Sequence, residues 1–133
     1  MGKMKILLVD DEKDLIMIMS RRIRGWGYDL ISALSGEEAI DVMKSRHPDV
    51  IILDYMMPEM DGVVTLREIR KINNDIPVIM FTAFPDKKSI EGSESLGVSA
   101  YIPKLSMFPN SESALKTALK IAEKRLKKGD VSL

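Results

Sequence analysis

The chain has 133 residues and a formal net charge of zero, from 20 basic and 20 acidic side chains. That length suits one domain, and the absence of cysteine excludes disulfides and thiolate zinc sites. A neutral chain is not drawn to nucleic acid or anionic membranes by long-range attraction. The sequence shows neither a secretory signal nor an apolar run long enough to cross a bilayer, so we expect a cytoplasmic protein.

The first third of the chain predicts a strand, a helix and a second strand. Ile6–Val9 is a short aliphatic run, typical of a strand buried on both faces of a parallel sheet. An amphipathic helix follows, and its expected buried face leaves Ile16 and Met17 partly exposed. That face comprises Leu15, Ile18, Met19 and Ile23. Tyr28–Ala33 is a weaker and more polar strand, which suits a sheet edge.

The middle of the chain repeats this alternation. Ser35 and Glu38 have the spacing of a capping box, and the helix that they begin ends at His47-Pro48. Val50–Leu53 is a second buried strand. Asp61 is a candidate N-cap for the next helix. The apolar side of that helix comprises Leu66, Ile69 and Ile72.

The last third contains two strands and two helices. Val78–Phe81 is a third buried strand, and Ala100–Ile102 a short final one. Between them, 86–96 is the weakest helix, because it is rich in serine and interrupted by Gly92. The last helix, expected to end at Gly129, buries an apolar stripe of Leu115, Leu119, Ala122 and Leu126. Its exposed face is expected to carry the ion pairs Glu112–Lys116 and Glu123–Lys127.

Five strands alternating with five helices predict a doubly wound α/β fold with a parallel sheet. Right-handed crossovers then place helices on both faces of the sheet. We expect a single domain over residues 1–133, with its core at about 4–128, and no output domain.

Five polar side chains follow the ends of four of the predicted strands. Asp10 and Asp11 follow the first strand, Asp54 the third, Thr82 the fourth, and Lys104 lies just beyond the fifth. Because parallel strands all end at one edge of the sheet, we expect these side chains to gather there.

Three crowded carboxylates repel one another unless a cation is present. Oxygen ligands with open positions suit Mg²⁺. A lysine and a hydroxyl beside them suit a transferring phosphoryl group, for which catalysis is mostly positioning and charge neutralisation. Asp54 is the natural nucleophile, because a carboxylate can form an aspartyl phosphate.

Four segments resemble the response-regulator receiver family of two-component signalling, in particular stand-alone chemotaxis-type receivers. They are Ile6–Glu12, Leu53–Gly62, Thr82-Ala83 and Tyr101–Lys104. The resemblance covers essentially the whole chain. It implies the flavodoxin-like strand order 2-1-3-4-5.

The resemblance also implies an acceptor and a metal site. Asp54 would accept the phosphoryl group from a histidine kinase or a histidine phosphotransfer protein. Asp11 would bind Mg²⁺ directly and Asp10 through water, with Asp54 and the backbone carbonyl of Met56 as further ligands; Mn²⁺ is a possible substitute. Such a domain catalyses only its own phosphorylation and slow dephosphorylation, so we do not expect an enzyme acting on free substrates.

The switch is implied in the same way. Lys104 would contact the phosphoryl oxygens, Thr82 would move to bond them, and Tyr101 would turn inward behind Thr82. Two hydrogen bonds to a charged group contribute roughly 3–6 kcal/mol, close to the ~5.5 kcal/mol that takes an equilibrium from 1:99 to 99:1. Removing Thr82 or Lys104 should therefore leave a phosphorylated but poorly activated protein.

The sequence departs from the family at Leu105, where a proline joined by a cis bond is usual. A cis bond to a non-proline residue costs about 2.5–4 kcal/mol, so we predict a trans Lys104–Leu105 bond. The loop 105–110 also looks longer than the family norm. Met56 and Phe84 stand two residues after Asp54 and Thr82, and neither can orient water, which predicts slow self-dephosphorylation.

The partners follow from these expectations. We expect a monomer or weak dimer that meets its phosphodonor near Ile16 and Met17 and presents the fourth helix, fifth strand and fifth helix to an unknown target. A relay intermediate and an unphosphorylated interaction module are the alternatives. Two other functions fit the sequence less well than a receiver. An aspartate-based phosphohydrolase usually has its nucleophile after the first strand, whereas Asp54 follows the third. A flavin-binding protein would need a first loop that accepts phosphate, whereas the first loop here is acidic.

Overall fold

Strands and helices alternate along the chain in the computed structural model, which describes residues 2–83, 85–104 and 108–128. Within these residues, five parallel strands form one sheet in the order β2-β1-β3-β4-β5. The strands are β1 (Lys5–Val9), β2 (Asp29–Ala33), β3 (Val50–Leu53), β4 (Val78–Thr82) and β5 (Ala100–Pro103). The helices are α1 (Lys13–Gly25), α2 (Gly36–Arg46), α3 (Gly62–Ile72), α4 (Lys87–Ser95) and α5 (Phe108–Lys128). The predicted α/β fold and strand order are confirmed.

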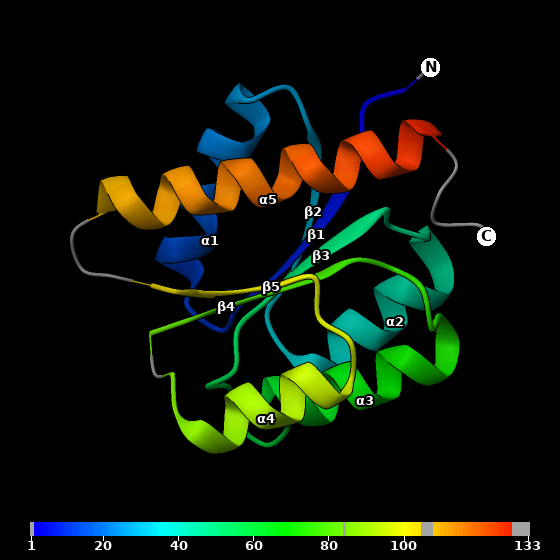
Figure 1. Ribbon diagram of the computed structural model, residues 1–133, viewed down its shortest axis with the longest axis vertical. Helices are drawn as coiled ribbons and strands as arrows, with labels where there is room; N and C mark the ends of the chain where they lie inside the picture. Colours follow the sequence, from blue (N-terminus) through cyan, green and yellow to red (C-terminus); the bar gives the residue numbers. More distant parts are fainter. Residues whose placement is uncertain (1, 84, 105–107, 129–133) are drawn as a thin grey trace.

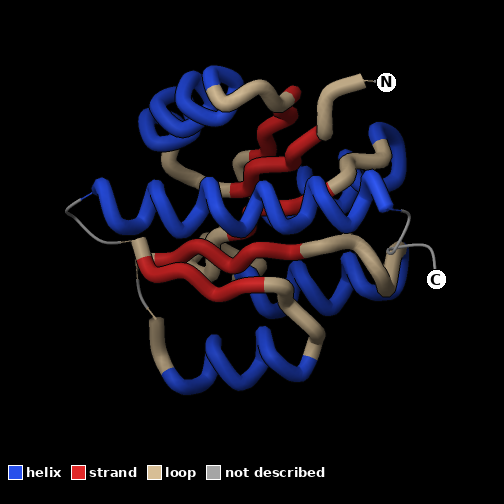
Figure 2. Tube along the Cα trace, turned by 45° about the horizontal axis from the view of Figure 1, so that its top comes forward, coloured by secondary structure: helices blue, strands red, loops and turns tan. Residues whose placement is uncertain are grey.

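The sheet is the middle layer of three (Figures 1 and 2). Helices α1 and α5 cover one face, and α2, α3 and α4 cover the other (Figure 1). Successive side chains of a strand point to opposite faces, so Ile6 and Leu8 of β1 pack toward α1 and α5, whereas Leu7 and Val9 pack toward α2 and α3. The polar strand β2 lies at one edge, as predicted, and the short strand β5 lies at the other, as the implied strand order requires.

The predicted caps form. The Ser35 hydroxyl accepts a bond from the Glu38 backbone N–H at 3.1 Å, and the Asp61 carboxylate accepts one from Val64 at 2.9 Å. The Glu38 carboxylate accepts from the backbone N–H of Leu34 at 3.3 Å, one residue before the position that a regular capping box uses. Helix α2 ends at Arg46 and is followed by its C-cap His47, whose φ of 49° is left-handed.

The predicted buried face of α1 is wrong at two positions. Ile16 is buried and Ile18 is exposed, so the exposed apolar pair is Met17 and Ile18. The buried stripe contains Ile16, Met19, Ser20 and Ile23, spaced three and four residues apart. Ile18 lies two positions, or about 200°, from Ile16 on a helix and therefore points away from the sheet.

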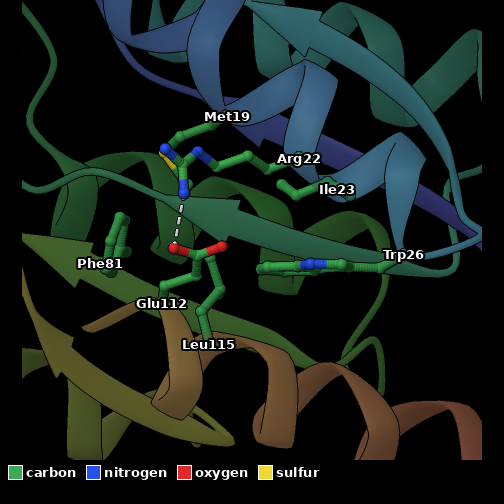
Figure 3. A pocket seen from close by; sticks show the side chains of 7 residues that line it. All are labelled: Met19, Arg22, Ile23, Trp26, Phe81, Glu112 and Leu115. Atoms are coloured by element: carbon green, nitrogen blue, oxygen red, sulfur yellow. Dashed lines mark hydrogen bonds and ion pairs between the residues drawn. The ribbon is translucent and has the colours of Figure 1, made fainter. Parts of the chain in front are cut away.

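One predicted ion pair of α5 is also wrong. Glu112 pairs with Arg22 of α1 at 2.7 Å (Figure 3). Lys116 lies over the ring of Trp26, the C-cap of α1, so neither side chain pairs with the other along α5. The pair Glu123–Lys127 forms at 3.8 Å. The predicted apolar stripe of α5 packs against the sheet. Gly129 lies outside the described residues. Among the helices that the structure describes, none combines the length and the apolar character needed to span a membrane.

Candidate functional site

Three functional side chains are placed by backbone bonds that continue the sheet beyond its strands. In each case the first residue after a strand donates its N–H to a carbonyl of the neighbouring strand. These bonds join Asp10 to Ala33 (3.1 Å), Asp54 to Val9 (3.0 Å) and Lys104 to Thr82 (2.7 Å). Because the strands are parallel, the three residues emerge at one edge of the sheet.

The structure brings the three predicted acidic residues together. One carboxylate oxygen from each of Asp10, Asp11 and Asp54 lies within 4.8 Å of the others. Asp10 and Asp54 are 2% and 5% exposed, whereas Asp11 is exposed at the rim. The cluster therefore has a buried floor and an open side from which an ion or a phosphoryl donor can approach.

Lys104 closes the inner side of the cluster. Its Nζ lies 2.5 Å from Oδ2 of Asp10 and 3.6 Å from Oδ1 of Asp54. The other oxygen of Asp10 accepts a bond from the Glu12 backbone N–H at 2.9 Å. Because both oxygens of Asp10 are engaged within the protein, Asp10 suits a metal contact through water better than a direct one. Asp11, at the open rim, suits a direct contact.

Burial raises the pKa of Asp54 to about 6. The positive charge of Lys104 opposes this rise, the negative charge of Asp10 adds to it, a hydrogen bond from Thr82 lowers the pKa again, and Asp11 raises it slightly. The Asp54 carboxylate is thus mainly ionised at neutral pH, at a cost that a cation in the cluster would reduce.

The donor set fits Mg²⁺. Its ligand oxygens lie about 2.0–2.1 Å from the ion, so two ligands of one ion are at most about 4.2 Å apart. The three carboxylates already lie within 4.8 Å of one another, and small side-chain rotations would close that difference. All the donors are oxygens, and the open rim leaves room for water and phosphate oxygens, as this ion prefers.

The two predicted switch residues lie on neighbouring strands, Thr82 on β4 and Tyr101 on the edge strand β5. Thr82, at the end of β4, is fully buried and bonds the carboxylate of Asp54. Tyr101, on β5, instead shares a hydrogen bond of 2.6 Å with the hydroxyl of Ser89. Asp86 is the N-cap of α4: its carboxylate accepts a bond from the backbone N–H of Ser89 at 2.7 Å, and the Ser89 hydroxyl accepts one from the backbone N–H of Asp86 at 3.4 Å. Tyr101 is thereby tied to the first turn of α4.

Sequence reasoning missed Ser89 and Gly62. Asp86 and Ser89 have the spacing of an N-cap and its third helical residue, which could have indicated the cap. Gly62 starts α3, and its N–H donates to the carbonyl of Tyr55 at 2.8 Å. A Cβ on Gly62 would overlap the carbonyl oxygen of Asp54 and the Cα of Tyr55. The loop that carries Met56 can close this tightly only around glycine.

We expect Gly62→Ala to displace the loop after Asp54, because the new methyl group would meet backbone and not a flexible side chain. The free energy of unfolding should fall by about 1–3 kcal/mol, the usual cost of overpacking, and Mg²⁺ affinity should fall with it. Urea denaturation and a metal titration measure the two effects. Gly25→Ala is the matched control, because nothing lies within 4 Å of a Cβ there. Equal behaviour of the two variants would contradict the expectation.

Three other predicted features involve residues that the structure does not describe. Leu105 lies outside the described residues, so the geometry of the Lys104–Leu105 bond does too. Phe84 and residues 105–107 of the predicted long loop also lie outside. Met56 is described and is 51% exposed, two residues after Asp54.

Comparison with known proteins covers most of the chain. Residues 6–120 match the family model described as "Response regulator receiver domain". A probable transcriptional regulator, ycf27 of Porphyridium aerugineum, is 39% identical over 93% of this chain and 51% of its own length. The chain thus spans about half the length of that relative.

Solved structures extend the comparison. A response regulator receiver domain protein of Clostridium thermocellum superposes with a TM-score of 0.83 at 28% identity, over 93% of this chain and 97% of that one. The response regulator TrrA of Thermotoga maritima, solved in complex with Mg²⁺-BeF, superposes with a TM-score of 0.75 at 30% identity, over 86% and 98%.

Proposed function

The chain belongs to the response regulator receiver family, and from that premise we propose that it is a phosphorylation-activated switch with Asp54 as its phosphoacceptor. Response regulators receive their phosphoryl group from histidine kinases, and we include histidine phosphotransfer proteins as donors. The observation that carries the proposal is the cluster of Asp10, Asp11 and Asp54 with Lys104 on its inner side.

The transfer needs an ionised nucleophile and charge neutralisation. An oxygen of Asp54 attacks phosphorus, the bond from phosphorus to the donor histidine nitrogen breaks, and the nitrogen leaves with the electron pair. With a pKa of about 6, Asp54 is mainly ionised at pH 7. The ammonium group of Lys104 faces the acceptor oxygen and offsets the negative charge of the incoming phosphoryl oxygens.

Mg²⁺ would be held by Asp11 directly, by Asp10 through water, by Asp54 and by the backbone carbonyl of Met56. When bound, the ion supplies the positive charge that lets carboxylates and phosphoryl oxygens share one site. Without such a cation, the negative charges of the three aspartates would repel an incoming phosphoryl group.

Thr82 and Tyr101 transmit the event in this proposal. The Thr82 hydroxyl leaves the carboxylate of Asp54 for a phosphoryl oxygen, and Tyr101 turns inward behind it. Turning inward breaks the bond between Tyr101 and Ser89, which releases the first turn of α4. The signal therefore reaches the surface formed by α4, β5 and α5, where we place the contact with the downstream target.

The deciding experiment is intact-protein mass spectrometry after exposure to acetyl phosphate and Mg²⁺. The wild type should gain the mass of one phosphoryl group, and Asp54→Ala should gain nothing. Chelation of the metal should abolish the gain in the wild type. Phosphorylation of Asp54→Ala to the wild-type level would place the acceptor elsewhere and defeat the proposal.

We propose a cytoplasmic receiver domain, monomeric or weakly dimeric, that either binds a downstream target when phosphorylated or relays its phosphoryl group onward. A phosphotransfer assay separates these two fates. Loss of label from Asp54 to a histidine of a second protein indicates a relay, whereas retention of the label with tighter target binding indicates a terminal regulator.

We expect a long-lived phosphoprotein, because the exposed Met56 side chain beside Asp54 cannot orient an attacking water. Met56→Asn should shorten the lifetime by about ten- to a hundredfold, since a positioned polar group assists proton transfer from water. Decay of the phosphorylated mass after removal of the donor measures it. Met17→Asn is the control, because its side chain is similarly exposed at 54%. A wild-type half-life of seconds that Met56→Asn leaves unchanged would contradict this expectation.

A further inference from the structure

Phe81 and Thr82 are neighbours on β4, so their side chains point to opposite faces of the sheet. Thr82 faces the carboxylate of Asp54. The ring of Phe81 is 3% exposed and belongs to the core beneath α1 and α5. Lys104 passes over that ring, with its Nζ 5.7 Å from the ring centroid. This distance is within the range of a cation–π interaction.

The ring differs in kind from the other contacts of the Lys104 ammonium group. Those contacts are the carboxylates of Asp10 and Asp54, which are also the groups that would hold Mg²⁺ and accept the phosphoryl group. Once a metal ion binds these carboxylates and a phosphoryl group is attached to Asp54, the attraction between the carboxylates and the Lys104 ammonium group weakens. An aromatic ring binds neither of the two, so its attraction for the ammonium group persists throughout the reaction.

Side chains of α1 and α5 enclose the ring of Phe81 on the side of the core. Its ring lines a cavity of about 10 Å³ between α1 and α5, with room for no more than one water molecule. Arg22 and Glu112, which form an ion pair, also line this cavity, and Phe81 and Trp26 lie on opposite sides of the pair (Figure 3). The backbone of Lys104 is anchored as well, by its 2.7 Å bond to the carbonyl of Thr82.

We propose that Phe81 is a positioning residue for phosphoryl transfer, which holds the ammonium group of Lys104 against the acceptor through its ring face. The proposal rests on the proposed function, because it assigns the geometry of Lys104 to a neighbour that touches neither metal nor phosphate. The ring of Phe81 orients the catalytic cation from one face of β4, and the hydroxyl of Thr82 serves the switch from the other.

A double-mutant cycle measures this coupling. Phe81→Leu keeps an apolar side chain but removes the ring, and should slow phosphorylation by acetyl phosphate and Mg²⁺ about three- to tenfold, the size of a partly desolvated cation–π contact. In a Lys104→Ala background the same change should have no further effect. Phe81→Tyr keeps the ring and should restore the wild-type rate. Additive effects of Phe81→Leu and Lys104→Ala would overturn the proposal.

Leu115→Ala is the matched control for packing, because Leu115 lines the same cavity from α5. It should destabilise the domain by about as much as Phe81→Leu or more. Its effect on the phosphorylation rate should be the same in the presence and absence of Lys104. A loss of rate that follows stability across both variants would show that Phe81 only packs the core.

NMR supplies a readout that needs no phosphorylation. The ε-methylene protons of Lys104 should be shifted upfield by the ring in the wild type and in Phe81→Tyr, with and without Mg²⁺, and should lose that shift in Phe81→Leu. Absence of the shift in the Mg²⁺-loaded wild type would overturn the proposal. If Asp54 accepts no phosphate at all, the proposed function fails through the rate assays, while this spectrum still reports on the contact alone.

Discussion

Asp54→Asn is expected to stabilise the metal-free protein at pH 7, although it removes the proposed acceptor. The carboxylate of Asp54 is buried among two other acidic groups, and its pKa is raised to about 6. Each pKa unit corresponds to about 1.4 kcal/mol between the protonation states. Asparagine avoids the cost of a buried negative charge, so the free energy of unfolding should rise by about 1–3 kcal/mol.

The gain should depend on pH in a defined direction. In the unfolded chain Asp54 ionises near its ordinary pKa of about 3.9, whereas in the folded protein it ionises near 6. Between these values the folded state binds more protons, so the stability of the wild type falls as pH rises. The stability of Asp54→Asn does not fall in this way, because asparagine does not ionise. The difference between the two proteins should be small near pH 4, grow through pH 6 and stay constant above pH 7.

Mg²⁺ should reverse the order of stability. An ion that binds only the folded state stabilises it by about 2.7 kcal/mol at a hundred times its dissociation constant, and the variant lacks one of the ligands. Urea denaturation across pH, with and without Mg²⁺, measures both effects. Asp41→Asn is the control for the loss of one charge, because Asp41 is exposed on α2. A gain for Asp54→Asn that is the same at pH 4 and pH 7 would exclude burial of the charge as its cause.

The position of the acidic cluster could be predicted because it depends on topology alone. Each of Asp10, Asp54 and Thr82 directly follows or ends a short aliphatic run, and parallel strands bring such positions to one edge. No detail of side-chain packing is needed for that step. The edge position of β2 was predicted from its polar composition, and that of β5 from the strand order that the family resemblance implies.

The buried face of α1, the ion pair of Glu112 and the contact of Lys104 with Phe81 depend on tertiary packing, which the sequence pattern of a single segment does not predict. Five apolar residues in a row, 15–19, allow more than one buried face, and only packing against the sheet selects Ile16 over Ile18. Glu112 is four residues from Lys116, as a helical ion pair requires, yet Arg22 from another helix reaches it. The contact of Lys104 with Phe81 joins the residue after β5 to β4, so no pattern local to either segment predicts it.

Removing the charge of Lys104 should have the largest effect on stability. Lys104→Met keeps a long apolar side chain but leaves the buried carboxylates of Asp10 and Asp54 without the cation that now lies between them. Breaking a buried pair by removal of one partner costs about 3–5 kcal/mol. We expect a loss of that size in the metal-free protein at pH 7. Acidification should recover part of it, because the pKa of Asp54 rises further without Lys104 and the carboxylate takes up a proton.

The same variant should bind Mg²⁺ more tightly than the wild type, because the positive charge of Lys104 already offsets the negative charge of the carboxylates that would attract the metal ion. Mg²⁺ should therefore restore more stability to Lys104→Met than to the wild type. Denaturation with and without metal, together with calorimetric titration, measures both. Lys71→Ala is the control, because it breaks an exposed pair with Glu68 and should cost at most about 1 kcal/mol. Weaker Mg²⁺ binding by Lys104→Met would mean that Lys104 assists the metal site instead of competing with it.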